Sequence, residues 1–266
     1  MKFMKIFIIN IEEYWERRNF QTAQAEAMEL EYEFVAGVDA MKLPEQVLQD
    51  AANNWSRPIS AKDIGCFLSH RKAWEAVLDH GERAIVIEDD VVFTKEFKSV
   101  ISSLFSLQHE KDAIYDLEFA PRNHLMAKSA SKLLDGTGAS ITKIYQNKVG
   151  LGCYSICPSS ASRLLKETNR FVLVDLFVWT RNWVRQFQVE PAPAIQMMFL
   201  DNVASHDNAK KSSLHKLYRN QSKLTAKLIS LKKLMTAARQ QLVGRIFGVS
   251  RHIKCDLRKF TKPQIK

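Results

Sequence analysis

Three adjacent carboxylates, Glu88, Asp89 and Asp90, directly follow the apolar run at residues 84–87. Ionised carboxylates at the mouth of a buried strand repel one another and resist the loss of water. Solvent, hydrogen-bond donors or a hard cation can compensate them, and Mg²⁺ and Mn²⁺ prefer oxygen ligands of this kind. The triplet therefore indicates either a metal site that serves a phosphorylated substrate or an acidic turn after a strand.

Two common classes of phosphate-binding protein are excluded by missing motifs. The chain contains no G-x-x-x-x-G-K-[ST] sequence, which a P-loop nucleotide hydrolase requires. It also lacks a G-x-G-x-x-G dinucleotide fingerprint, and Gly150-x-Gly152 does not follow a suitable first strand. A response regulator would place its paired acids near the first strand, whereas these acids lie far along the chain.

Strand-like and helix-like segments alternate around the triplet. Apolar runs predict strands at residues 5–10, 32–38, 84–87, 113–119 and 149–156. Helical patterns fall at residues 12–30, 60–79, 95–107 and 158–167, the second with a Ser60-x-x-Asp63 start and a His80-Gly81 end. This alternation predicts an α/β fold with a mainly parallel sheet flanked by helices.

Two regions lack a clear pattern. Residues 40–60 are expected to form a loop, and residues 121–147 read as a polar loop that covers a substrate. In parallel sheets, ligands bind outside the carboxyl ends of the strands. Asn10, Asp39 and Glu88–Asp90 follow predicted strands, so we expect them at one edge.

The block from Asp63 to His70, followed by Trp74 and by residues 84–91, resembles the signature of glycosyltransferase family 25. Weaker similarity extends over residues 5–206, including Asn10 with Arg17-Arg18, residues 34–39, Gly150-x-Gly152 and residues 191–196. One departure is Asp116-Leu-Glu-Phe, where relatives tend to carry a plainer apolar strand end.

The resemblance implies a GT-A-type nucleotide-sugar fold in which Glu88-Asp89-Asp90 stands for the D-x-D motif. Asp90 would bind Mn²⁺ or Mg²⁺, with Glu88 and His206 as further metal ligands. The nucleotide-sugar would contact residues that share the expected edge or its approach: Asn10, Arg17, Arg18, Asp39, Ser69, His70, Glu88 and Asp89. Gly65 and Cys66 are expected to permit close packing instead.

An inverting transfer needs a general base for the acceptor hydroxyl. Asp116, Glu118 and Asp175 are the candidates. Asp175 is preferred, because it interrupts an apolar segment where a core residue would be expected. A buried salt bridge would explain Asp175 nearly as well.

The net charge of +10 is unevenly distributed. Residues 208–266 carry 16 Lys and Arg against a single Asp, so residues 1–207 are acidic overall. We therefore predict a catalytic domain at 1–207 and a basic helical tail at 208–266. Apolar residues recur at helical spacing from Leu214 to Phe247. Such a helix could bind an anionic membrane or dock on the body or on a second subunit, which would make a homodimer.

Four scattered cysteines favour free thiols in a reducing cytoplasm. Cys153 and Cys157 are not expected to bind zinc, because no second pair of ligands has suitable spacing. The start of the chain reads as a strand rather than a signal peptide, and no apolar run is long enough to span a membrane.

Together with the resemblance, these features predict a cytoplasmic enzyme at the inner face of the bacterial inner membrane. It would transfer galactose from UDP-galactose to a lipooligosaccharide or lipopolysaccharide acceptor. UDP-glucose is the alternative donor, and a nucleotidyltransferase on the same fold is a further alternative. A non-enzymatic membrane-binding or nucleic-acid-binding protein acting through its tail also stays open. Nucleic acid is the less expected partner, because no known binding motif is present.

Overall fold

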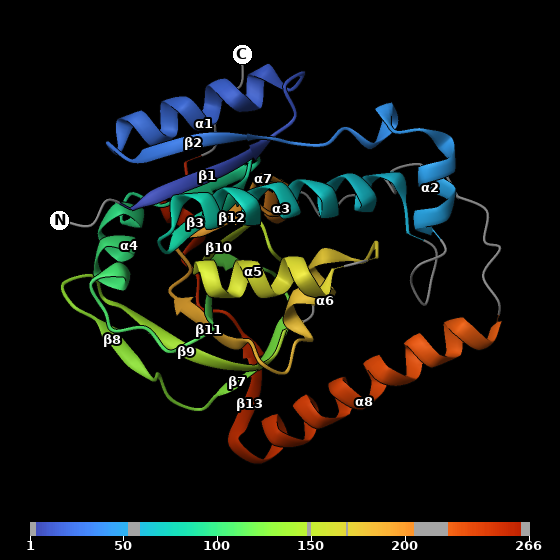
Figure 1. The fold of residues 1–266 in the computed structure, drawn as a ribbon. Helices are drawn as coiled ribbons and strands as arrows, with labels where there is room; N and C mark the ends of the chain where they lie inside the picture. Colours follow the sequence, from blue (N-terminus) through green and yellow to red (C-terminus); the bar gives the residue numbers. More distant parts are fainter. Residues whose placement is uncertain (1–3, 53–58, 148–149, 169, 205–222, 262–266) are drawn as a thin grey trace.

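The computed structural model describes residues 4–52, 59–147, 150–168, 170–204 and 223–261 (Figure 1). A large sheet runs through the molecule in the order β13-β7-β9-β11-β5-β10-β3-β1-β2, and β8 pairs with β9. Its strands are β1 (Lys5–Asn10), β2 (Glu31–Ala36), β3 (Ala84–Glu88), β5 (Ala113–Asp116), β7 (Asn123–Ala127), β8 (Lys132–Leu134), β9 (Ala139–Gln146), β10 (Cys153–Ile156), β11 (Arg185–Glu190) and β13 (Gly248–His252). A small second sheet has the order β4 (Val91–Phe93), β12 (Ala194–Gln196), β6 (Glu118–Phe119).

Helices cover both faces of the large sheet. One apolar core lies between the sheet and α3 (Ala61–His80), α5 (Pro158–Glu167) and α6 (Val174–Trp179). A second core on the other face includes residues of α1 (Trp15–Ala27) and α4 (Phe97–Phe105). Figure 1 shows α3 and α5 side by side across the front of the sheet. The remaining helical segments are η1 (Ala40–Lys42), α2 (Glu45–Ala52), α7 (Met197–Ala204), α8 (Lys223–Phe247) and η2 (Leu257–Lys259).

The signals that predicted α3 are present in its structure. The Ser60 side chain accepts a hydrogen bond from the Asp63 N–H, and the Asp63 carboxylate accepts one from the Ser60 N–H, which completes a capping box. Gly81 ends the helix in the left-handed conformation that glycine adopts readily. These two ends fix the register of α3, and hence which of its side chains face β3.

The predicted α/β class is confirmed, but the expectation of a mainly parallel sheet is wrong. β1 pairs in parallel with β2 and β3, and β5 pairs in parallel with β11. β10 runs antiparallel between β3 and β5, and β7, β8, β9 and β13 form antiparallel pairs. Apolar periodicity identifies a strand but does not encode its direction, so the sheet is mixed.

Three segments differ from their sequence interpretation. The predicted strand 113–119 divides at Leu117 into β5 and β6, which belong to different sheets. Residues 40–52, expected as loop, form η1 and α2; Pro44 precedes α2, and its carbonyl accepts the Val47 and Leu48 N–H groups. The expected covering loop 121–147 forms β7, β8 and β9, and buried Ile141 and Ile144 anchor β9.

The C-terminal segment contains a long helix, α8, as predicted. The residues after α8 pack into the rest of the protein instead of forming part of a separate tail. β13 extends the large sheet by pairing with β7, while Ile253 and Phe260 are buried. Arg251 donates two hydrogen bonds of 2.6 Å to buried Glu190 on β11. The proposed boundary between residues 207 and 208 lies outside the described residues. Among the described helices, none is long and apolar enough to cross a membrane.

Candidate active site

The acidic triplet lies at the carboxyl end of β3, where Glu88 is the last strand residue and Asp89-Asp90 form the turn into β4. β1 runs parallel to β3 and ends at Asn10, with Ile9 in register with Glu88. The Asn10 side-chain amide donates to Asp89 Oδ2 at 2.8 Å. Asn10 and the triplet therefore share one edge of the sheet, as the sequence predicts.

Asp89 is held by three residues from outside β3. Besides Asn10, Arg17 on α1 donates to Asp89 Oδ1 at 2.9 Å, and Gln21 donates to the Asp89 carbonyl. Burial opposes the charge of Arg17, but the hydrogen bond and charge of Asp89 raise the pKa of Arg17 above its ordinary value. Asp89 thus anchors the turn, and both of its carboxylate oxygens already accept hydrogen bonds.

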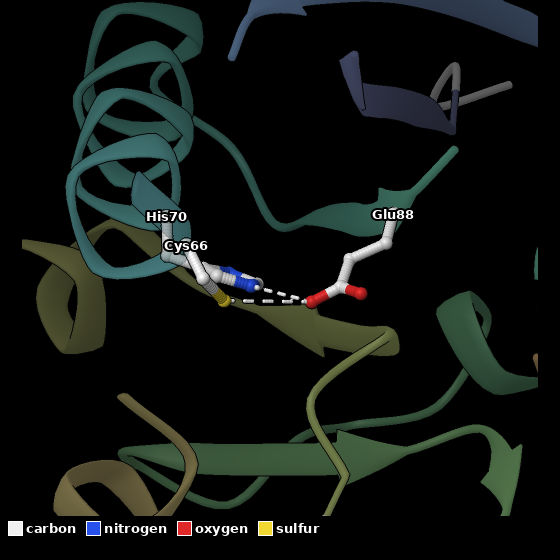
Figure 2. A group of neighbouring side chains, drawn as sticks. All are labelled: Cys66, His70 and Glu88. Atoms are coloured by element: carbon white, nitrogen blue, oxygen red, sulfur yellow. Dashed lines mark hydrogen bonds and ion pairs between the residues drawn. The ribbon is translucent and has the colours of Figure 1, made fainter. Parts of the chain in front are cut away.

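Glu88 lies opposite α3 and contacts two of its side chains (Figure 2). Its Oε1 lies 3.2 Å from His70 Nε2 and 3.8 Å from Cys66 Sγ. Its Oε2 accepts a hydrogen bond of 3.0 Å from the Gln196 side chain. Burial opposes ionisation, but His70 outweighs it and holds the pKa of Glu88 below its ordinary value.

Asp90 is the least constrained acid of the triplet. Among the described residues, the Asp90 side chain accepts one hydrogen bond, from Gln196 Nε2 at 3.4 Å from Oδ1. Burial, followed by the charge of Glu88, raises the pKa of Asp90 to about 6. The same Gln196 nitrogen thus contacts oxygens of both Glu88 and Asp90, which brings two oxygen donors with unbalanced negative charge together. That donor set fits Mg²⁺ or Mn²⁺.

Like the other predicted nucleotide contacts, Arg18, Asp39 and Ser69 have partners within the protein. Arg18 lies over the Phe34 ring, 3.9 Å from its centroid, while Asp39 accepts the Met41 N–H at the start of η1. Ser69 accepts the Val38 N–H and donates to the Gly65 carbonyl, and so ties α3 to the end of β2. Nucleotide contacts by Arg18, Asp39, Ser69 and Arg17 stay predictions.

Two of the three candidate bases, Asp116 and Glu118, are buried. Asp116 accepts the Glu118 N–H and the Asn147 amide, while Glu118 Oε1 accepts the Gly152 N–H. Burial raises the pKa of both carboxyls well above their ordinary values. Glu118 Oε2 is buried without a hydrogen-bond partner among the described residues. Burial therefore favours the protonated form of both carboxyls.

Asp175 in the first turn of α6 is partly exposed. Its Oδ2 accepts the Gly150 N–H at 3.2 Å. Burial, followed by the charge of Glu88, raises the pKa of Asp175 to about 6. Among the three candidates, it alone combines partial exposure with a carboxylate that is ionised at neutral pH.

The glycines of Gly150-x-Gly152 leave room for Glu118. A Cβ atom on Gly152 would lie 2.6 Å from Glu118 Oε2 and 3.1 Å from Gln196 Nε2, and one on Gly150 would meet Glu118 Oε1. Gly65 has a comparable role in α3, since its Cβ would lie 2.6 Å from the Val38 carbonyl oxygen. The expectation that Gly65 permits close packing is confirmed.

Sequence reasoning missed the roles of Gln196 and Tyr154. Gln196 is the last residue of β12, where the sequence predicted an extended segment but no role for this side chain. Tyr154 on β10 contacts His70 Nδ1 at 3.0 Å and accepts from Trp74 Nε1 at 2.8 Å. Both lie far from the triplet in sequence, so only the sheet order brings them together. His206, the third expected metal ligand, lies outside the described residues.

The fold and this edge define an α/β protein with an acidic site at the ends of β1 and β3. Residues 3–178 match the family model described as "Glycosyltransferase family 25 (LPS biosynthesis protein)". The chain belongs to glycosyltransferase family 25, as its sequence signature indicates.

Several curated relatives carry related names. Procollagen galactosyltransferase 2 of Homo sapiens is 30% identical over 142 residues, which are 50% of this chain and 23% of that protein. A glycosyltransferase 25 family member of Aedes aegypti is 28% identical over 202 residues, 69% of this chain and 33% of that protein. An inactive glycosyltransferase 25 family member 3 of Homo sapiens is 28% identical over 133 residues, 46% of this chain and 22% of its own length. The chain thus spans a third or less of these relatives.

Among solved structures, a glycosyltransferase involved in the glycosylation of the major capsid of PBCV-1 aligns with 74% of this chain and 94% of its own. The TM-score is 0.40 and the sequence identity is 10%. A likeness this remote adds nothing to the family assignment.

Proposed function

We propose that this protein is a divalent-metal-dependent, inverting glycosyltransferase that moves a hexose from a UDP-sugar to an acceptor sugar. The observation that carries the proposal is the pair of carboxylates, Glu88 and Asp90, that meets at Gln196 beside the end of β1. Two acids so placed, one with its pKa raised to about 6, form a site that binding of a cation would stabilise.

Asp90 and Glu88 are the residues that would hold the metal. Bound Mn²⁺ or Mg²⁺ supplies positive charge that makes the diphosphate a better leaving group. Asp89 contributes indirectly, because Asn10 and Arg17 fix its carboxylate and thereby orient its two neighbours. Whether His206 completes the ligand set stays a prediction.

Asp175 is the proposed general base. The acceptor hydroxyl attacks the anomeric carbon while its proton passes to the Asp175 carboxylate, and the bond from sugar to UDP breaks. A base with a pKa of about 6 is ionised at neutral pH yet basic enough to take a proton as the bond forms. Asp116 and Glu118 fit this role less well, because both are buried and burial raises the pKa of each well above its ordinary value.

The names of the relatives guide the choice of donor and acceptor. Procollagen galactosyltransferase 2 supports galactose as the first donor to test, with glucose as the alternative. The family description, LPS biosynthesis protein, supports a lipooligosaccharide or lipopolysaccharide sugar as acceptor. Inactive relatives make a direct assay essential.

The proposal is tested by incubating the full chain with UDP-galactose, UDP-glucose and other UDP-sugars, with and without Mn²⁺. We expect UDP release that depends on the metal and is fastest with UDP-galactose. Mn²⁺-dependent binding of UDP, measured by calorimetry, gives a second readout. Inertness toward every UDP-sugar, together with no UDP binding by folded protein, would contradict the proposal.

The exposed face of α8 supports a second proposal, which concerns location. Met235, Leu242 and Ile246 follow one another at helical spacings of seven and four residues, and their exposed fractions are 66%, 63% and 58%. On the opposite face, Gly244 packs against Leu125 and Tyr145. The helix therefore presents an apolar stripe away from the body.

We propose that this stripe and the surrounding basic residues bind an anionic membrane. Arg239 and Arg245 are exposed on the same helix. A basic helix with an outward apolar stripe is typical of peripheral membrane binding. The inner face of the bacterial inner membrane, on the cytoplasmic side, would place the enzyme beside a lipooligosaccharide acceptor. Docking of a second copy on the stripe is the competing outcome.

Co-sedimentation with phosphatidylglycerol vesicles tests this location. Leu242→Gln combined with Ile246→Gln should weaken binding about tenfold or more, because apolar burial is lost. Leu133→Gln on β8 is the matched control, since Leu133 is equally exposed but lies outside α8. Binding unaffected by the double change, or a concentration-dependent dimer that the change abolishes, would overturn the membrane proposal.

A further inference from the structure

Cys66 and His70 form a cluster with Glu88, but neither of these two residues has a role in the proposed transfer reaction. Cys66 and His70 are separated by one helical turn on α3, so their side chains share a face of that helix. Figure 2 shows both pointing toward Glu88 on β3. The sulfur, the imidazole nitrogen and a carboxylate oxygen all lie within 4.8 Å of one another.

This donor set is the one that zinc prefers. Zn²⁺ binds Cys sulfur at about 2.3 Å, and His nitrogen and Glu oxygen at about 2.0–2.1 Å, in tetrahedral geometry. A tetrahedron with these bonds separates nitrogen from oxygen by about 3.3 Å, and sulfur from oxygen by about 3.5 Å. The corresponding separations here are 3.2 Å and 3.8 Å. Two of the three donor separations are therefore close to those of a zinc tetrahedron, and the third, from sulfur to nitrogen, is no more than 4.8 Å.

The residues behind His70 would support metal binding. Tyr154 Oη lies 3.0 Å from His70 Nδ1 and is itself held by the Trp74 N–H at 2.8 Å. A partner at one ring nitrogen orients the other toward the metal. The His70 side chain is 1% exposed, whereas that of Glu88 is 27% exposed. The cluster is thus buried on the α3 side and partly exposed to solvent on the Glu88 side.

The two carboxylate oxygens of Glu88 face different partners. Oε1 faces Cys66 and His70, while Oε2 accepts from Gln196, which also contacts Asp90. Soft sulfur and imidazole donors select zinc, whereas carboxylate oxygens alone select Mg²⁺ or Mn²⁺. Glu88 therefore lies between a site suited to one class of metal and a site suited to the other.

We propose that Cys66, His70 and Glu88 form a Zn²⁺ site. Zinc bound there inhibits transfer, because it takes Glu88 away from the Mn²⁺ or Mg²⁺ site that Glu88 would share with Asp90. The inhibitory part rests on the proposed function, whereas the metal site does not. Burial, followed by the charge of Glu88, raises the pKa of the Cys66 thiol. Binding therefore releases the thiol proton to solvent as the sulfur–zinc bond forms.

Titration of the full chain with Co²⁺, a spectroscopic substitute for zinc, tests the site directly. We expect one equivalent to produce the intense near-ultraviolet band of a cobalt–thiolate bond, and Zn²⁺ to displace it. Cys66→Ser should abolish the band and weaken zinc binding by about 10–100-fold, because it replaces the sulfur ligand. Cys157→Ser is the control, since Cys157 is another partly exposed thiol far from Glu88 in sequence. Thermal denaturation confirms that each variant is folded.

The inhibitory part is tested by adding Zn²⁺ to the UDP-galactose assay at constant Mn²⁺, with each variant compared to its own zinc-free rate. The zinc concentration for half inhibition should rise tenfold or more in Cys66→Ser but not in Cys157→Ser. A cobalt–thiolate band in a protein inert toward all UDP-sugars would defeat the proposed function and leave the zinc site standing. An active protein without the band, or with a band that Cys66→Ser retains, would overturn the zinc site.

Discussion

Two pairs of acids, Glu88 with Asp90 and Asp116 with Glu118, have the same spacing but differ in their exposure to solvent. Glu88-x-Asp90 at the end of β3 lies beside donors from other elements, and Glu88 is partly exposed. Asp116-x-Glu118 spans the break between β5 and β6 and is buried. The first pair can accept a cation from solvent, whereas the second is closed off by surrounding chain.

The contrast arises from what lies against each pair. Gly150 and Gly152 let the backbone close over Glu118, leaving no room for solvent or a ligand beside it. At the first pair, the adjoining groups are the side chains of His70 and Gln196. Acids of the same type and spacing therefore differ in how well they could bind a metal, according to their neighbours. Predictions that separate the two pairs follow from this difference.

The largest expected effect is on activity, and it arises at the open pair, Glu88 and Asp90. Asp90→Ala should lower metal-dependent transfer by on the order of 10²–10³-fold, because the carboxylate that binds the cation is removed. Its effect on unfolding should be small, since Asp90 makes only a long hydrogen bond to Gln196. Turnover of UDP-galactose with Mn²⁺ and chemical denaturation are the two measurements. Retained turnover of Asp90→Ala at saturating Mn²⁺ would contradict the proposal that Asp90 binds the cation needed for transfer.

Asp175 should respond next most strongly. Asp175→Asn should lower kcat by about 10²-fold, because the amide cannot take the acceptor proton. In the unchanged protein the rate should fall as the pH drops below about 6, where Asp175 becomes protonated. The residual rate of the variant should lack this acidic limb. Saturating Mn²⁺ is needed, because its charge lowers the pKa of Asp90 out of the same range.

The Asp175 prediction depends on distinguishing the open acids from the closed ones. If Asp175→Asn kept both the rate and the acidic limb, one of the buried acids, or another group, would have to serve as base. Asp116→Asn and Glu118→Gln would then be the variants to compare under the same conditions.

Much of the open site was predictable from sequence, because its residues are close to strand and helix signals. The apolar run before Glu88 identifies β3, and the caps of α3 set which face carries His70. The shared edge of Asn10 and the triplet follows from the parallel pairing of β1 and β3.

The burial of the closed pair, Asp116 and Glu118, was not predictable from sequence. It depends on strand direction and on contacts between distant segments. The residues from Ala113 to Phe119 predict a single strand, yet Leu117 separates two sheets. Burial of Glu118 requires β10 to enter antiparallel between β3 and β5, which brings Gly152 against it. Periodicity contains neither the direction of β10 nor its neighbours.

The closed pair should be sensitive to added volume. Gly152→Ala places a Cβ atom 2.6 Å from Glu118 Oε2, and we expect a loss of about 1–3 kcal/mol in unfolding free energy. Chemical denaturation measures the loss. In a Glu118→Ala background the same change should cost much less, and a double-mutant cycle isolates that coupling. Additive effects of the two changes would mean that Glu118 does not fill the space beside Gly152.

The smallest expected effect is a change in the pH dependence of stability. Burial, followed by the charge of Asp116, raises the pKa of Glu118 in the folded protein. The stability that this group contributes is complete below its unfolded pKa of about 4.3 and is lost as the pH rises toward the folded value. Glu118→Gln cannot ionise, so its stability relative to the unchanged protein should improve with pH, by up to about 1.4 kcal/mol per pH unit.

Glu190 provides a buried control with the opposite sign. Burial opposes its charge, but the hydrogen bonds from Arg251 and from the Lys254 N–H outweigh it and lower the pKa of Glu190. Its contribution is present above the unfolded pKa of about 4.3 and is lost as the pH falls toward the folded value. Denaturation of Glu118→Gln and Glu190→Gln between about pH 3 and 8 should therefore give stability differences that change in opposite directions, above about pH 4.3 for Glu118→Gln and below about pH 4.3 for Glu190→Gln. Parallel curves would show that a positive charge compensates Glu118, and the two acidic pairs would then differ in access alone rather than in charge.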